Sequence, residues 1–504
     1  MTHSSLVLDP RFSLADVDRR LFGSFVEHMG RCVYTGIFEP GHPAAHESGL
    51  RGDVLELVRE LGPTLVRYPG GNFVSSYRWE DGVGPVEERP SRLDLAWRAL
   101  EPNTFGLNEF MEWARAAGVE PMMAVNLGTR GVAEACDVLE YSNHPSGTYL
   151  SDLRRSHGVK DPHDITLWCL GNELDGPWQV GQKTAHEYGR LAAEAGKAMR
   201  LVDPSIELVA VGSSNSGMPT FASWESTVLE HTYDVVDYIS LHAYYEQHDD
   251  DVASFLATAV DMDMFIDAVI ATADHVGAKL RRSKKLRLAF DEWNVWYQQR
   301  FVGQTNLEWE YARPLIEDSF TVVDAVVVGS YLISLLNHAD RVAIACQAQL
   351  VNTIAPILTE PGGRAWRQTI FHPFAQAARL ARGRVLRPLI ESSHYATERF
   401  GEVPLLHATA TFDDDSGDLC LFAVNRSTTG TLPLAADVRG FGALRVAEHS
   451  VLADDDLQAR NTAEQPDRVA PRRGTGARLE DGQLTVALPP ASWNVLRLSP
   501  LPAG

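Results

Sequence analysis

The chain has few cysteines, and they are scattered along its 504 residues. There are five, an odd number, and no two are spaced as Cys-x-x-Cys. Disulfide frameworks use an even set at regular spacing, and structural zinc sites use closely spaced pairs. The pattern therefore predicts reduced thiols, as in cytoplasmic proteins. The cysteines are Cys32, Cys136, Cys169, Cys346 and Cys420.

Positive charge is also in short supply. Lys and Arg total 45 against 67 Asp and Glu, a formal net charge of −22. Such a surface repels nucleic acid and anionic membranes, so neither is predicted as a partner. A neutral small molecule or a polysaccharide fits this balance better than a phosphate-rich ligand.

No apolar run reaches the roughly 18 residues that a membrane span needs. The nearest candidate, residues 325–336, contains Gly329, Ser330 and Ser334, which favours a buried helix. The amino-terminal residues carry no basic stretch followed by an apolar run, the signature of a secretory signal. Together with the cysteines, these features predict a cytoplasmic location.

Motifs for metals and nucleotides are missing as well. No Gly-x-Gly-x-x-Gly follows an early strand, and no His-Glu-x-x-His occurs. The acidic runs at residues 249–251 and 413–415 lack the spaced ligands and the glycine of an EF-hand loop. We therefore expect neither a metal nor another cofactor.

The first three quarters of the chain alternate short apolar runs with amphipathic stretches. Residues 54–61, 108–117, 184–201 and 318–335 have apolar residues at three- and four-residue spacing, which indicates helices. A doubly wound sheet also alternates in this way, but eight strand candidates favour a (β/α)8 TIM barrel, placed at residues 17–383. The eight candidates are residues 22–27, 64–68, 120–126, 165–170, 207–211, 236–242, 286–290 and 342–346.

After residue 383 the pattern changes to short, partly alternating strands separated by Asp, Gly, Pro and Ser. They lie at residues 407–412, 419–424, 444–448, 484–488 and 493–498, with a polar loop at 459–477. This pattern predicts an antiparallel, jelly-roll-like β-sandwich over residues 384–504. Residues 5–8 precede the barrel, and we expect the segment 1–16 to add an edge strand to the sandwich.

Two glutamates follow predicted barrel strands, where barrel enzymes carry their chemistry. Glu173 follows the fourth strand and Glu292 the seventh, so the pair should face each other across the barrel mouth. Glycosidic cleavage needs two such carboxylates, ~5–5.5 Å apart for retention of configuration or ~6.5–9.5 Å apart for inversion. A single loop glutamate is as often a helix cap or an ion-pair partner, but the pair together favours catalysis.

The residues around both glutamates resemble the motifs of glycoside hydrolase family 51, which consists mainly of α-L-arabinofuranosidases. Residues 168–179 (WCLGNELDGPWQ) resemble its acid/base motif, and residues 290–297 (FDEWNVWY) its nucleophile motif. The resemblance extends from about residue 17 to residue 498. It implies a barrel with a β-sandwich, a retaining mechanism and no cofactor. Further matches are residues 67–73 (RYPGGNF), 79–85 (WEDGVGP), 141–149 (YSNHPSGTY), 237–242 (DYISLH) and 347–357 (QAQLVNTIAPI).

The resemblance also implies roles for single residues. Glu173 is expected to be the general acid/base, with a raised pKa, and Glu292 the ionised nucleophile. Arg67 is expected to keep the nucleophile charged, because a nearby cation lowers a carboxyl pKa. Asn172 should bind the sugar hydroxyl beside the reacting carbon.

Six further residues match positions that bind or surround the sugar in the family. We expect one group to bind the furanose hydroxyls, a tyrosine to donate a hydrogen bond to the nucleophile, and two tryptophans to form apolar walls. The residues expected to bind the hydroxyls are Glu27, Asn72 and Gln349. The tyrosine is Tyr244, and the two tryptophans are Trp178 and Trp296.

One position departs from the family pattern. Ala243 stands where the family usually has a longer polar residue, so it would widen the pocket if its side chain lines it. The implied function is exo-acting release of terminal α-L-arabinofuranosyl residues from arabinan or arabinoxylan oligosaccharides. A second possibility is another retaining glycosidase on the same scaffold, such as a β-xylosidase, β-glycanase or galactofuranosidase. A third is a non-catalytic carbohydrate-binding protein. The resemblance further implies a homo-oligomer, often a hexamer in this family.

Overall fold

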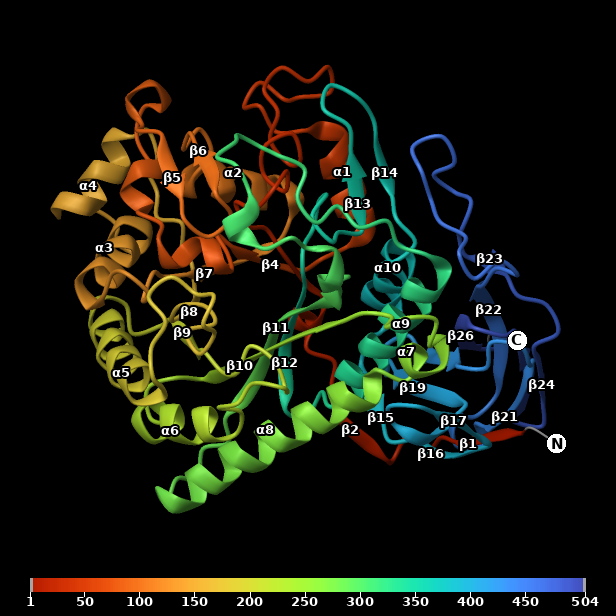
Figure 1. Ribbon diagram of the computed structural model, residues 1–504. Helices are drawn as coiled ribbons and strands as arrows, with labels where there is room; N and C mark the ends of the chain where they lie inside the picture. The colour runs from red at the N-terminus through yellow and green to blue at the C-terminus, as the bar shows by residue number, and fades with distance from the viewer. Residues whose placement is uncertain (1–2, 502–504) are drawn as a thin grey trace.

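Eight parallel strands close into a barrel in the computed structural model, which describes residues 3–501 (Figure 1). The strands follow one another around the barrel in chain order, and the last closes against the first. This confirms the predicted TIM barrel. The strands are β3 (Gly23–Phe25), β4 (Leu65–Tyr68), β7 (Glu120–Ala124), β8 (Leu167–Cys169), β9 (Glu207–Ala210), β10 (Tyr238–Tyr245), β11 (Arg287–Val295) and β12 (Val342–Gln347).

Helices surround the barrel, and local sequence sets where they begin and end. α5 begins after Thr184, whose side chain accepts from the Glu187 amide while Glu187 caps the Thr184 amide in return. α1 ends at Gly62, whose φ of 76° suits glycine. The helices are α1 (Gly52–Leu61), α2 (Leu107–Ala117), α3 (Val132–Asn143), α4 (Tyr149–Ser156), α5 (Ala185–Val202), α6 (Ser223–Thr232), α7 (Val252–Leu256), α8 (Ala259–Lys279), α9 (Val322–Asn337) and α10 (Phe371–Leu380).

Strands β10 and β11 run further than predicted. Because β10 and β11 pair as far as Tyr245 and Val295, Tyr244 and Glu292 lie within strands and do not follow them. The predicted helix at residues 318–335 begins later, at Val322, where Thr321 provides the side-chain cap.

Two packed sheets form the second domain (Figure 1). Apolar side chains from both sheets form one core, as predicted for a sandwich. The five-stranded sheet has the order β16-β1-β21-β25-β24 and the seven-stranded sheet the order β2-β15-β19-β20-β26-β22-β23. Their strands are β1 (Ser4–Val7), β2 (Ser13–Asp16), β15 (Arg384–Leu386), β16 (Leu389–Ser392), β19 (Leu406–Phe412), β20 (Leu419–Asn425), β21 (Leu432–Asp437), β22 (Leu444–Leu452), β23 (Arg472–Arg473), β24 (Arg478–Glu480), β25 (Gln483–Leu488) and β26 (Ser492–Pro500).

The amino-terminal segment contributes two strands to the sandwich: β2 lies at the edge of the seven-stranded sheet, beside β15, whereas β1 is not at an edge. β1 lies between β16 and β21 and pairs with β21 in parallel. The predicted edge position and the purely antiparallel pattern are therefore wrong at this strand. β1 is separated from its neighbours β16 and β21 by more than 350 residues, and the spacing of residues in the sequence does not show which distant strands will pair. Residues 1–2 and 502–504 of the predicted sandwich lie outside the described residues.

Helix α9 connects the two domains. Its side chains from Val322 to Leu336 are buried, because it packs on the barrel and also against sandwich strands β19, β20 and β26. This explains the unusually apolar run that the sequence showed at residues 325–336. Within the described residues, no helix has both the length and the apolar character needed to cross a membrane.

A hairpin of the sandwich reaches the barrel mouth. It consists of β17 (His394–Thr397) and β18 (Gly401–Pro404), which pair antiparallel. β17 packs against α7, the short helix that follows β10. Both domains therefore contribute to the surface around the carboxyl ends of the barrel strands.

Candidate active site

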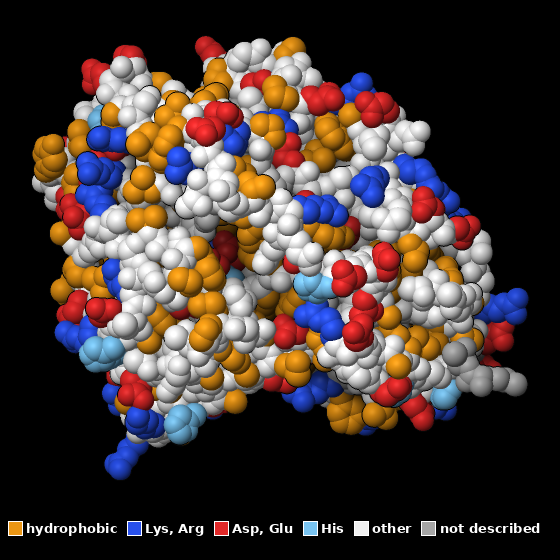
Figure 2. Space-filling view, viewed as in Figure 1, with side chains coloured by type: hydrophobic (Ala, Val, Ile, Leu, Met, Phe, Trp, Pro, Cys, Tyr) orange, Lys and Arg blue, Asp and Glu red, His pale blue; other side chains and the backbone are white. Residues whose placement is uncertain are grey.

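A cavity of about 480 Å³ opens at the carboxyl ends of the barrel strands. In the space-filling view it is a hollow with acidic side-chain surface on its floor (Figure 2). Active sites of TIM barrels lie at this face. The predicted residues that line it are Glu27, Asn72, Glu173, Trp178, Tyr244, Glu292, Trp296 and Gln349.

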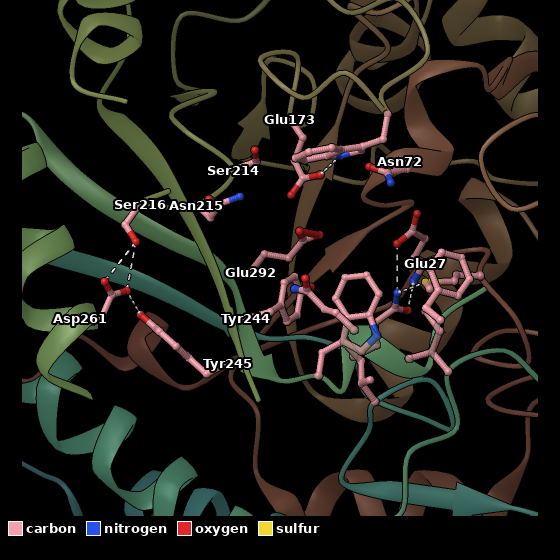
Figure 3. Close-up of a pocket in the computed structure, with 18 of the residues that line it drawn as sticks. Glu27, Asn72, Glu173, Ser214, Asn215, Ser216, Tyr244, Tyr245, Asp261 and Glu292 are labelled. Carbon is pink, nitrogen blue, oxygen red and sulfur yellow. Dashed lines mark hydrogen bonds between the residues drawn. The ribbon is translucent and has the colours of Figure 1, made fainter. Parts of the chain in front are cut away.

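Glu173 is placed by a tight turn after β8. Gly171 has φ of 101°, and Glu173 itself has φ of 42°, in the left-handed region that few residues other than glycine adopt. Such conformations cost free energy and are concentrated at functional sites. The turn directs the Glu173 side chain toward Glu292 (Figure 3).

Glu292 and its neighbour Asp291 both contact groups at the barrel centre, although successive strand residues normally point to opposite faces. The pairing of β11 with β12 shifts register between Phe290 and Trp293. A bulge of this kind bends the strand and re-aims its side chains. The irregularity therefore explains how two adjacent carboxylates meet the same partners.

His242 joins these carboxylates. Its Nδ1 lies 2.9 Å from Glu173 Oε1 and 2.9 Å from Glu292 Oε2, and its Nε2 lies 3.4 Å from Asp291 Oδ1. Burial opposes a charge on the ring, but the Glu292 charge and the bonds to the other two carboxylates outweigh it. The pKa of His242 is therefore raised well above its ordinary value, which favours the imidazolium form of the ring.

Arg67 supplies the second cation of the site. Its Nε lies 3.1 Å from Asp291 Oδ2, its Nη1 3.4 Å from Glu292 Oε1, and its Nη2 donates to Asn172 Oδ1 at 2.8 Å. The predicted contact with Glu292 is present, but Asp291 is the closer partner. Burial favours a neutral Asp291, yet Arg67 and His242 outweigh it and lower the pKa of that carboxyl.

The environment of Glu173 favours its protonated form. Burial is the largest cause and the charge of Glu292 is the next, and both raise the pKa of Glu173 above its ordinary value. The opposing contacts are those from His242 and from Trp178, whose Nε1 donates to Glu173 Oε2 at 2.7 Å. Trp178 is 40% exposed, so it forms the rim of the cavity as well as contacting Glu173.

Glu27 lies across the cavity, where three donors surround its carboxyl group. Phe73 N and Trp97 Nε1 donate to Oε1 at 2.9 and 2.8 Å, and Gln349 Nε2 donates to Oε2 at 3.0 Å. Even so, burial and the charge of Glu292 raise the pKa of Glu27 to about 8. Glu27 and Gln349 are thus held as one rigid polar wall.

Asn72, Tyr244 and Trp296 also line the cavity, whereas the predicted Asn172 is buried and does not. Asn172 Nδ2 donates to Asn72 Oδ1 at 3.2 Å, so Asn172 holds the Asn72 amide in place at the cavity wall. The Tyr244 and Trp296 rings meet edge to face, with centroids 5.2 Å apart. Among the described residues, the hydrogen bonds on the Glu292 carboxylate come from cationic side chains, and the predicted bond from Tyr244 is not among them.

Ala243 does not line the cavity. It is buried in the apolar layer between the barrel and its helices, since His242 and Tyr244 on either side of it face the site. The condition under which Ala243 would widen the pocket is therefore not met.

Sequence reasoning missed His242, Asp291 and Trp97. His242 ends the matched motif at residues 237–242, and Asp291 immediately precedes Glu292, so both had a signal. Their roles depend on the bulges in β10 and β11, which the sequence pattern does not show. Trp97 comes from a loop far from any strand candidate.

Two family models match the chain. The model described as "Alpha-L-arabinofuranosidase 1 domain" matches residues 57–258, and that described as "Alpha-L-arabinofuranosidase C-terminal domain" matches residues 291–492. Together the two matches cover most of the barrel and most of the sandwich.

Curated relatives are similar over nearly the whole chain. An intracellular exo-α-(1→5)-L-arabinofuranosidase of Streptomyces lividans is 62% identical over 99% of this chain and 75% of the relative. A protein of the same name from Halalkalibacterium halodurans is 56% identical, over 98% of this chain and 99% of the relative.

Solved structures agree with these relatives. The family 51 α-L-arabinofuranosidase AbfB of Bifidobacterium longum superposes with a TM-score of 0.95, at 46% identity over 99% of each chain. The arabinose complex of an α-L-arabinofuranosidase from Thermotoga maritima gives 0.88, at 33% identity over 98% of this chain and 100% of that one.

Proposed function

Since the chain belongs to glycoside hydrolase family 51, the family of α-L-arabinofuranosidases, we propose that it removes terminal α-L-arabinofuranosyl residues from arabino-oligosaccharides with retention of configuration. The chain is a glycoside hydrolase, and its relatives favour arabinofuranosidase activity over the β-xylosidase, β-glycanase and galactofuranosidase alternatives. The names of these relatives also support arabinose-containing oligosaccharides as the substrates.

In the proposed first step, Glu292 attacks the anomeric carbon while Glu173 gives its proton to the departing glycosidic oxygen. The glycosidic bond breaks and a glycosyl ester forms on Glu292. In the second step Glu173 takes a proton from water, the water oxygen bonds to the anomeric carbon, and the ester bond to Glu292 breaks. Both carboxyl groups then regain their starting states.

The spacing of the two carboxyl groups is the observation that carries this proposal. One oxygen of Glu173 and one of Glu292 lie within 4.8 Å of each other. Retaining glycosidases have carboxyl groups ~5–5.5 Å apart, whereas inverting ones need ~6.5–9.5 Å to admit water. The raised pKa of Glu173, beside cations that contact Glu292, supports the assignment of acid and nucleophile.

The walls of the cavity support a terminal furanose as the bound sugar. Glu27, Gln349 and Asn72, whose amide Asn172 holds in place, offer polar groups to ring hydroxyls. Tyr244 and Trp296 offer apolar surface. We also propose a cytoplasmic location, which the printed names of the relatives support. The proposed homo-oligomer, up to a hexamer, rests on the family resemblance alone.

The test is hydrolysis of 4-nitrophenyl α-L-arabinofuranoside beside the β-xyloside, β-glucoside and β-galactofuranoside. We expect release from the arabinofuranoside alone, reduced by at least about 10³-fold in Glu292→Ala, because the covalent route is lost. In Glu173→Ala, activity on an oligosaccharide should fall about 10²–10⁴-fold, and activity on the aryl glycoside by less, since nitrophenolate needs little protonation.

The stereochemistry is tested separately, in dilute methanol. Proton NMR should show a methyl α-L-arabinofuranoside as the first product, because two inversions at the anomeric carbon restore its configuration. A methyl β-anomer would contradict the retaining mechanism. Turnover of another glycoside in place of the arabinofuranoside would contradict the substrate.

A further inference from the structure

The cavity extends past the two catalytic carboxylates, on the side away from Glu27 (Figure 3). Three polar residues meet there. Ser216 Oγ lies 3.2 and 3.1 Å from the two oxygens of Asp261, and Tyr245 Oη donates to Asp261 Oδ2 at 3.0 Å. Asp261 comes from the first turn of α8, so a helix holds this group in place.

The wall of this extension includes residues of the sandwich. Arg399 and Phe400, from the turn between β17 and β18, line the same cavity as Glu173 and Glu292. The hairpin is fixed to the barrel at two points: Tyr395 Oη donates to Ala253 O at 3.0 Å, and Arg399 N donates to Ser254 Oγ at 3.2 Å. The turn is therefore a built part of the cavity and not a loose loop.

The chemistry of the extension matches a neutral sugar. The Asp261 carboxylate, the Ser216 hydroxyl and the Arg399 guanidinium offer acceptors and donors to sugar hydroxyls, and Phe400 offers an aromatic face to sugar C–H groups. A site of this mixed character, continuous with the catalytic cavity, suits the remainder of an oligosaccharide whose terminal residue lies beside Glu27 and Glu292.

We infer that the β17–β18 hairpin and the Ser216–Tyr245–Asp261 group form a binding site for the leaving part of the substrate, the residues that follow the terminal arabinofuranose. This inference rests on the proposed function. Through Arg399 and Phe400, the sandwich sets the preference for oligosaccharides over small glycosides. Because a nitrophenyl group is much smaller than an oligosaccharide, we expect it to make no contact with the hairpin.

The test compares kcat/KM on linear α-1,5-arabinotriose and on 4-nitrophenyl α-L-arabinofuranoside for the full chain, Phe400→Ala and Arg399→Ala. We expect a loss of about 5- to 20-fold on arabinotriose in each variant, mainly through KM, as for the loss of one apolar or hydrogen-bonding contact. Activity on the aryl glycoside should stay within about twofold of the parent.

Glu398→Ala is the matched control, because Glu398 is exposed in the same turn but does not line the cavity. It should leave both activities unchanged. Equal losses on both substrates in Phe400→Ala and Arg399→Ala, or no loss on arabinotriose, would overturn the inference while leaving the proposed function intact. If the parent enzyme does not cleave the aryl arabinofuranoside at all, the proposed function fails, and the inference fails with it.

Discussion

His242 holds a positive charge between the Glu173, Asp291 and Glu292 carboxylates. That charge lowers the pKa of Glu173 from what burial and Glu292 would otherwise produce. In His242→Gln the opposing cation is absent, so the pKa of Glu173 rises further. We expect the alkaline limb of kcat/KM against pH to move to higher pH, and kcat to fall by about 10²-fold.

His163→Gln is the control for that experiment. His163 is also a buried histidine, but it contacts Asn108 outside the site. Its replacement should leave the pH profile in place. A limb that moves to lower pH in His242→Gln, or does not move, would show that His242 is neutral or acts only in packing.

Glu27 makes the stability of the protein depend on pH. Its pKa is raised to about 8 in the folded state from an ordinary value of 4.5, so its stabilising contribution is complete below pH 4.5 and is lost as the pH rises through 8. Full ionisation costs about 3–5 kcal/mol by linkage. Glu27→Gln removes this dependence.

Calorimetric unfolding at pH 5.5 and 8.5 measures the effect. The parent should lose more stability between the two pH values than Glu27→Gln does. A difference that is the same in both proteins would mean that the three donors around Glu27 keep its carboxyl group ionised throughout.

At the scale of single residues, sequence reasoning placed eight predicted residues at one cavity, because the ends of parallel barrel strands converge. It did not foresee which side chains pair. The sequence motif predicts a contact of Arg67 with Glu292, but Arg67 lies closer to Asp291. That preference depends on the bulge in β11, a property of strand pairing and not of residue type.

Among the elements, α9 is the one whose packing is most constrained. A Cβ atom on Gly329 would lie 2.5 Å from Trp493 Cε3 of the sandwich, and the Trp493 ring is fixed by its bond to Gln376 at 2.8 Å. Gly→Ala in a helix interior normally stabilises by about 0.5–1 kcal/mol. Here we expect Gly329→Ala to destabilise by about 1–3 kcal/mol through overpacking.

Urea denaturation of Gly329→Ala measures this change in the free energy of unfolding. The control is Gly118→Ala, since Gly118 has open space around its missing side chain and a φ of 76°, so its cost is local strain alone. If Gly329→Ala stabilises the protein, Trp493 moves freely and the two domains are not tightly packed at α9.

The elements were predictable where their signals are local. Helix ends were marked by Thr184 and Gly62, and barrel strands by apolar runs of four or more residues. The sequence pattern does not predict several strands of the sandwich, such as β16 and β21. Where these strands begin and end depends on pairing with segments far away in the chain. The same distance explains the wrong position of β1.

At the scale of the whole molecule, the amino-terminal strand β1 joins β16 to β21 and so completes the five-stranded sheet of the sandwich. Leu6 is buried in the sandwich core, whereas Val7, on the other face of the strand, is 45% exposed. We expect Leu6→Ala to cost about 2–5 kcal/mol, the usual range for a buried leucine. Val7→Ala should cost less than about 1 kcal/mol.

Thermal unfolding, followed by far-UV circular dichroism and by residual activity, distinguishes the two variants. Because the hairpin that lines the cavity belongs to the sandwich, activity on arabinotriose should be lost at the same temperature as the sandwich structure in Leu6→Ala. Equal effects of the two substitutions would mean that β1 is not needed to hold the sheet together.

The position of β1 and β2 also has a consequence for how the protein is made. Both strands leave the ribosome before the barrel, yet their partners β16, β21 and β15 lie beyond residue 383. During translation the nascent strands must therefore wait, unpaired, while more than 350 residues are added. Each strand is only four residues long and half of its residues are polar, so little apolar surface is exposed in that interval. We expect the barrel to fold before the two sheets of the sandwich are completed.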